Sequence, residues 1–99
     1  MLYIGFVGPK IGGNGFSAIS PDFANLVGSA ETRDLAIIQL EHSIRQQLEC
    51  MHKSGFRAPP PMTIDEIQQQ DAYRGLVRGD NAKVRLIRLC AHEPSTAIH

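Results

Sequence analysis

The stretch FSAISPDFANLVGSAET, residues 16–32, contains the change of sequence pattern that decides the fold. Its first part, Phe16–Ser20, is a short apolar run typical of a β-strand, and the Pro-Asp dipeptide behind it favours a turn. Phe23–Gly28 has the length and composition of a further strand. Thr32, at the end of the stretch, belongs to the residue types preferred at a helix N-cap. The stretch therefore predicts strand, turn and strand, followed directly by a helix.

A glycine-rich segment, GPKIGGNGF at residues 8–16, separates this stretch from an earlier strand candidate, Leu2–Val7. A Walker A loop would need Lys-Ser/Thr where this chain has Asn14-Gly15, and it would open onto a helix. This segment opens onto a strand, and Asn-Gly is a strong hairpin signal because both residues tolerate positive φ. We therefore predict a hairpin turn without a phosphate site, and a meander of three antiparallel strands.

The segment after Thr32 has helical periodicity. Its apolar residues recur at steps of three and four: Ile37, Leu40, Ile44, Leu48 and Met51. Such a stripe is typical of an amphipathic helix. Gly55 is a suitable residue just beyond a helix C-terminus, and the prolines at 59–61 prevent any continuation. We predict a helix from about Arg33 to Ser54, long enough to cover one face of a small sheet.

The last third of the chain contains a second helix candidate and a final strand candidate. A capping-box pattern, Thr-Ile-Asp-Glu at residues 63–66, predicts a short helix. Residues 68–80 carry no strong signal for either type of element. Lys83–Leu89 has the pattern of a strand with Val84 and Leu86 on the same face. We therefore expect a single α+β domain over residues 1–90, followed by a flexible C-terminal tail at 91–99.

The composition is that of a small globular protein. The chain has 99 residues, of which 42% are hydrophobic and 20% are charged. No apolar run approaches the roughly 20 residues of a transmembrane helix, and the N-terminus lacks a leader pattern. Two cysteines are too few for a disulfide framework. We therefore expect a cytoplasmic protein with reduced thiols and no membrane partner.

The formal charge is zero overall but unevenly distributed. Residues 1–71 contain five basic and eight acidic side chains, a net charge of −3, whereas residues 72–90 contain five basic and one acidic, a net charge of +4. A chain that binds nucleic acid along its whole length would be basic overall. A local RNA-binding surface is an alternative, and its candidate residues are Arg74, Arg78, Lys83, Arg85 and Arg88. The nearby aromatic residues are sparse, which favours a solvated strand face instead.

The sequence contains no motif that predicts catalysis or metal binding. Two Cys-x-His pairs occur, at residues 50–52 and 90–92, but residues two apart on a helix point in nearly opposite directions and cannot easily share one metal. No strand–Gly-x-Ser-x-Gly–helix turn is present, and no activated-cysteine signature either. The adjacent carboxylates Asp65 and Glu66 are explained by helix capping. We therefore predict no catalytic residue, no metal site and no cofactor.

The predicted long helix has one feature that suggests a partner. Leu35 and Ile38 lie outside its apolar stripe, among His42, Arg45 and other polar residues. Isolated apolar side chains on a surface are ordinary, but two neighbours at the start of a helix can join a dimer or partner contact.

The order of these features resembles that in the N-terminal domain of HicB-like antitoxins. The features are FSAISPDFANLV, Ala-Glu-Thr at 30–32, the long helix and the exit SGFRAPPP. The resemblance covers about residues 2–67 and, more loosely, the last strand. The chain differs from the family pattern at Asn25, where a glycine is usual, and at Ala30-Glu31, where Gly-Asp is usual. Leu35 replaces an acidic residue. The sequence is that of a divergent member.

This resemblance implies a partial RNase H-like fold, with three antiparallel strands, a covering helix and a fourth strand beside the first. It implies a non-enzymatic protein that binds and masks a small HicA-like, mRNA-cleaving toxin, and we expect a homodimer. Pro21, Asp22, Leu35 and Ile38 form the expected partner surface, and the acidic first 71 residues would attract a basic toxin. Many relatives carry a C-terminal DNA-binding module, for which the residues after Leu89 are too few, so operator binding is not expected. An orphan scaffold domain is the remaining alternative.

Overall fold

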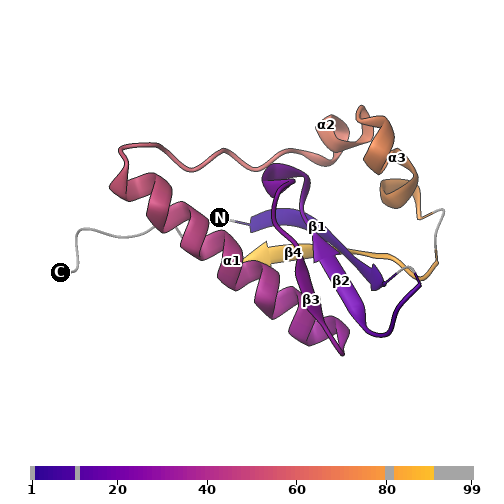
Figure 1. Cartoon of the computed structure of the whole chain (residues 1–99). Helices are drawn as coiled ribbons and strands as arrows, with labels where there is room; N and C mark the ends of the chain where they lie inside the picture. The colour runs from indigo at the N-terminus through magenta and orange to yellow at the C-terminus, as the bar shows by residue number, and fades with distance from the viewer. Residues whose placement is uncertain (1, 11, 80–81, 91–99) are drawn as a thin grey trace.

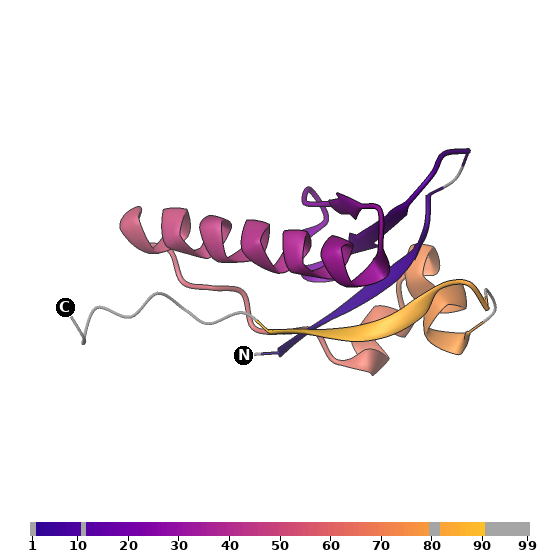
Figure 2. The ribbon, with the colours of Figure 1, turned by 90° about the horizontal axis from the view of Figure 1, so that it is seen from below.

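The computed structural model describes residues 2–10, 12–79 and 82–90. It has four antiparallel strands in the order β3-β2-β1-β4, with a long helix on one face and two short helices on the other (Figures 1 and 2). The elements are β1 (Leu2–Pro9), β2 (Phe16–Ile19), η1 (Pro21–Phe23), β3 (Gly28–Ala30), α1 (Arg33–Lys53), α2 (Ile64–Gln68), α3 (Asp71–Arg78) and β4 (Arg85–Cys90). The α+β class and the place of the last strand beside the first are confirmed. The predicted tail lies outside the described residues.

The glycine-rich segment forms the predicted hairpin between β1 and β2, but with a longer turn. Pro9 and Phe16 form the last cross-strand pair, and the Lys10 N–H donates to the Gly15 C=O across 3.1 Å. Gly12 and Gly15 adopt positive φ, of 71° and 96°, whereas Asn14 does not. Glycine is also required at position 15 because a Cβ there would lie 2.6 Å from the Ala30 C=O.

The prediction of a strand over Phe23–Gly28 is wrong, because the third strand begins only at Gly28. Pro21 starts a 3-10 turn, and Phe23 closes it with its ring in the core, 4.9 Å from the Tyr3 ring in an edge-to-face contact. A short apolar run does not distinguish a strand from a buried turn. Asn25 in this turn does not adopt a left-handed conformation, since no described residue other than glycine has positive φ.

The long helix agrees with its prediction. The Thr32 hydroxyl accepts the Leu35 N–H and caps the first turn. Four buried side chains, Ala36, Leu40, Ile44 and Leu48, pack on one face of the sheet, mainly over β2 and β3. At the other end Gly55 has φ +83°, and the Phe56 N–H donates to the Met51 C=O, a Schellman-type ending.

The second face of the sheet is covered by α2 and α3. Ile4 and Phe6 of β1 form a buried cluster there with Ile67 of α2. The predicted capping box of α2 is present. The helix α3 was not predicted from the sequence; it packs Tyr73 parallel to Phe6, with ring centroids 6.2 Å apart.

The final strand was predicted over Lys83–Leu89 and extends over Arg85–Cys90. Leu86 lies on the α2–α3 face, as Val84 does, and Ile87 and Leu89 lie on the α1 face. Both faces of β4 are therefore partly covered. None of the helices in the described ranges is long and apolar enough to cross a membrane.

Candidate protein-binding surface

The side of α1 that points away from the sheet carries two exposed apolar residues. Leu35 is 50% exposed and Ile38 is 55% exposed. Both lie opposite the buried stripe centred on Leu40 and Ile44, and Figure 2 shows no other helix or strand over this side. We call the exposed residues Glu31, Asp34, Leu35, Ile38, His42 and Arg45 the outer face of α1. Two large apolar side chains on a free helix face are a feature of binding surfaces.

Charges surround this apolar pair. Glu31 and Asp34 precede it, and both are exposed. His42 and Arg45 follow it one to two turns later. A shallow depression of about 520 Å³ lies beside Ile38, lined by Ile38, Gln39, His42, Ser43 and Arg45. The N-terminal half of the outer face is thus apolar and acidic, and basic side chains begin only at its far end.

The Pro21-Asp22 turn, predicted to be part of the same surface, makes internal contacts. Pro21 is buried. The Asp22 carboxylate accepts the Met62 N–H at 3.2 and 3.3 Å, and this bond fastens the segment between α1 and α2. The same segment is held by the Tyr3 hydroxyl, which donates to the Pro59 C=O at 2.8 Å. Pro21 and Asp22 therefore stabilise contacts within the chain, whereas the side chains of Leu35 and Ile38 are exposed and accessible to a partner.

Burial is the main cause of the shifted pKa of the Asp22 carboxyl group. Desolvation raises the pKa of its carboxyl group above the usual value of 3.8, and the negative charge of Glu66 raises it further. The hydrogen bond from the Met62 N–H opposes both by stabilising the carboxylate. Burial therefore makes the charged form of this carboxyl group less favourable in the folded chain than in water.

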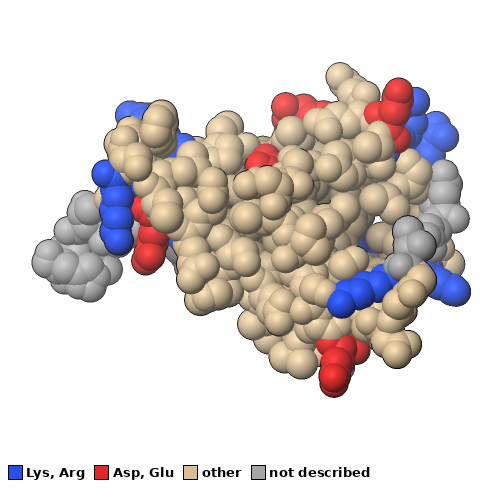
Figure 3. All heavy atoms as spheres, in the orientation of Figure 1, with Lys and Arg blue, Asp and Glu red and all other residues tan. Residues whose placement is uncertain are grey.

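The five basic residues proposed for RNA binding do not form one surface. Arg85 and Arg88 are an odd number of residues apart on β4 and lie on opposite faces of the sheet. Arg74 forms an ion pair with Asp71 at 3.1 Å, and its Nε donates to the Gln68 C=O at 3.0 Å. On the face of the molecule seen in Figure 3, the lysine and arginine side chains appear in separate groups rather than as a continuous stripe.

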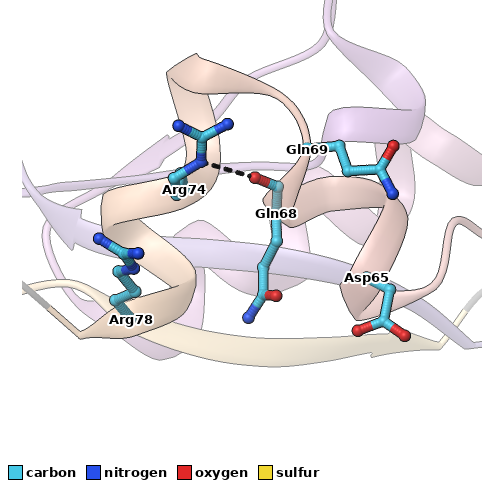
Figure 4. Close-up of a pocket in the computed structure, with 5 residues that line it drawn as sticks. All are labelled: Asp65, Gln68, Gln69, Arg74 and Arg78. Atoms are coloured by element: carbon cyan, nitrogen blue, oxygen red, sulfur yellow. Dashed lines mark hydrogen bonds between the residues drawn. The ribbon is translucent and has the colours of Figure 1, made fainter.

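A polar notch lies where α2 meets α3 (Figure 4). Its volume is about 430 Å³, and it is lined by Asp65, Gln68, Gln69, Arg74 and Arg78. A carboxylate stands on the α2 side of this notch and two guanidinium groups stand on the α3 side. Since Asp65 opposes any anion that the arginines would attract, the notch is a poor phosphate site.

A larger groove lies on the same side of the sheet, beside α3. It measures about 680 Å³ and has an apolar floor with basic residues at its rim; the lining residues are Phe6, Gly8, Pro9, Lys10, Ser17, Ile19, Leu76, Lys83 and Val84. The groove was missed from the sequence because its wall, α3, was missed. The spacing of Tyr73, Leu76 and Val77 is a helical pattern that would have indicated this wall.

The described residues contain no arrangement for metal or thiol chemistry. No group of three or more His, Cys, Asp and Glu side chains that could hold a metal lies within residues 2–10, 12–79 and 82–90. Cys50 and Cys90 are both exposed, and they are not joined in a disulfide.

Comparison with known proteins identifies a similar fold at low sequence identity. No protein-family model matches the sequence, and no curated protein matches it either. The crystal structure of the Burkholderia pseudomallei antitoxin HicB is similar, with a TM-score of 0.70 over 100% of this chain and 73% of that one, at 17% sequence identity. This chain therefore has the fold of that antitoxin, the fold that the sequence resemblance predicted.

Proposed function

We propose that this chain is a HicB-like antitoxin, which binds a small HicA-like, mRNA-cleaving toxin and masks it through protein–protein contacts. One observation carries the proposal: the whole chain shares the fold of an antitoxin, although only 17% of the aligned residues are identical. The sequence features that resemble the family, from the Pro-Asp turn to the proline-rich exit, point in the same direction. In this role the protein is not an enzyme, needs no cofactor and acts in the cytoplasm. Its relation to RNase H stays a prediction.

The outer face of α1 is the surface that we assign to the toxin. Leu35 and Ile38 supply apolar area that is already exposed in the free protein, so binding requires no unfolding. Glu31 and Asp34 beside them attract a basic partner, and HicA-like toxins are generally basic. The basic surfaces elsewhere on the chain would repel such a toxin.

Co-expression with the small open reading frame next to the gene tests the proposal. The wild-type chain is expected to relieve the growth arrest that the toxin causes. The double variant Leu35→Asp/Ile38→Asp is expected to lose this protection, because it places two charges in the centre of the contact. Growth arrest that the wild-type chain does not relieve would contradict the antitoxin role.

Phe56→Asp provides the matched control. Phe56 is 66% exposed and lies beyond the C-terminus of α1, away from the outer face. The same change from an exposed apolar residue to aspartate should leave protection intact there. Equal loss of protection in both variants would show that the outer face is not the contact.

A further inference from the structure

The two edges of the sheet differ in how their backbone groups are satisfied. At one edge β3 has only three residues, and the Ser29 N–H donates to the Gln39 side chain at 3.1 Å. At the other edge β4 has six residues and no proline. An edge strand of this length is a template for pairing with another strand unless it is blocked.

The hydrogen bonding of β1 determines which groups of β4 point outward. Successive residues of a strand direct their N–H and C=O alternately to one neighbour and to the other. The Ile4 C=O accepts the Ser20 hydroxyl at 2.8 Å, on the β2 side, so Ile4 and its partner Arg88 form a pair without mutual hydrogen bonds. Leu86, two residues earlier, has the same orientation. The N–H and C=O groups of Leu86 and Arg88 therefore point away from β1.

The C-terminal end of this edge is covered by a side chain. The Cys90 N–H donates to the Glu41 carboxylate at 2.7 Å. Before the strand, the Lys83 C=O lies near Gly8, on the β1 side, where it accepts a hydrogen bond of 3.4 Å from the Arg33 guanidinium, so it is not part of this outer edge. Within residues 2–10, 12–79 and 82–90, no group bonds the outward backbone of Leu86 and Arg88. The centre of β4 is thus an open edge, and both residues are exposed.

We propose that a second copy of this chain pairs with β4, antiparallel and centred on Ile87, so that the two sheets become continuous. In this register Leu86 lies opposite Arg88 of the other copy, and the outward N–H and C=O groups of both residues find partners. Ile87 lies opposite its own equivalent. A two-fold axis normal to the sheet generates this pairing and uses the same residues on both copies, as an isologous dimer requires.

Charge complementarity selects the second copy as the occupant. Arg85 shares the α1 face of β4 with Ile87 and Leu89. In the proposed register it lies opposite Leu89 of the other copy, next to the residue whose N–H is held by Glu41. The Arg85 guanidinium therefore reaches Glu41 of the other copy, and symmetry repeats the pair. No arginine lies opposite another, whereas a basic partner at this edge would meet repulsion.

The dimer does not rest on the antitoxin proposal, because it involves the chain alone and leaves the outer face of α1 uncovered. Sedimentation velocity of the purified full chain over a concentration series tests it. We expect reversible dimerisation with a dissociation constant of about 1–100 μM, in the range of small interfaces. A chain that stays monomeric at about 500 μM, well above this range, would overturn the proposal.

Arg88→Pro tests the backbone pairing. Its N–H points to solvent in the monomer, so proline removes a donor that the fold does not use. We expect at least about a tenfold weaker dimer with the circular dichroism spectrum unchanged, and Arg88→Ala should dimerise like the wild type. Equal dimerisation of the proline and alanine variants would contradict pairing through this edge.

A charge exchange tests the register. Arg85→Glu alone and Glu41→Arg alone should each weaken the dimer about tenfold, because each puts like charges together. The double variant carries both changes on each copy and should restore the wild-type constant to within about threefold. If the double variant is as weak as the single ones or weaker, the two residues do not meet across the interface.

Discussion

The two faces of the sheet are covered in different ways. Under α1, nine of the described residues form one buried cluster, built on a helix of 21 residues. Under α2 and α3, three of the described residues form the buried cluster, and the two helices have only five and eight residues. The first face is a complete core, whereas the second is a partial cover that leaves a groove beside Phe6 and Leu76.

This difference indicates where the stability of the domain lies. A long amphipathic helix buries a continuous stripe, while helices of one or two turns are marginal without tertiary contacts. We therefore expect the α1 side to unfold together with the sheet, and α2 and α3 to open separately at lower cost.

Truncation of one buried residue on each face tests this comparison and has the largest expected effect. Leu40→Ala on the α1 side should lower the free energy of unfolding by about 3–4 kcal/mol, and Ile67→Ala on the other side by about 2 kcal/mol. Both side chains are fully buried, so their exposure does not explain the difference. Urea denaturation measures both values.

Hydrogen exchange distinguishes local from global opening in the same two variants. In Ile67→Ala the faster exchange should be confined to α2 and α3, and in Leu40→Ala it should extend over the sheet. A global loss of protection in Ile67→Ala would show that the two faces form one cooperative unit.

The two faces also differ in how well their sequence predicts them. For α1, the apolar period, the Thr32 cap and Gly55 agree with one another, and the predicted helix differs from the observed one by a single residue. For α3, Tyr73, Leu76 and Val77 have the right spacing, but the segment is short and contains Gly75, which disfavours a helix. Its helix is stabilised by packing on Phe6, which lies far away in the sequence.

Side-chain contacts between distant segments explain the remaining errors. The aspartate of the Pro-Asp turn looks like an exposed turn residue, yet it accepts the Met62 N–H, 40 residues away. Phe23 looks like the start of a strand, but its ring fills the core beside Tyr3. Leu35 and Ile38 were predicted to be exposed because their positions follow from the helical period alone, and their exposure is confirmed.

The smallest expected effect concerns the bond between the Pro-Asp turn and the segment that leads to α2. The pKa of Asp22 is raised in the folded chain, mainly by burial, so the folded state holds this proton more tightly than the unfolded state. The protonated Asp22 carboxyl group therefore stabilises the fold at pH values below the pKa that it has in the unfolded chain. This stabilisation is lost as the pH rises through the pKa that it has in the folded chain.

Asp22→Asn removes this titration while its amide oxygen can still accept the Met62 N–H. Between pH 3 and pH 6, the wild type should lose stability relative to the variant as the pH rises. Thermal unfolding of both proteins across this range measures the difference. A wild type that instead gains stability over the variant with rising pH would show that the hydrogen bond outweighs burial at this site.

The central claim, that the outer face of α1 binds a toxin, is tested most directly by the affinity between the two purified proteins. Isothermal titration calorimetry with the toxin encoded beside the gene should give a tight complex for the wild-type chain. Leu35→Asp/Ile38→Asp should bind at least about 100-fold more weakly, since it disrupts the centre of the contact. Its unfolding free energy should stay within about 1 kcal/mol of the wild type, because both positions are exposed. Undiminished affinity of this variant would contradict the account.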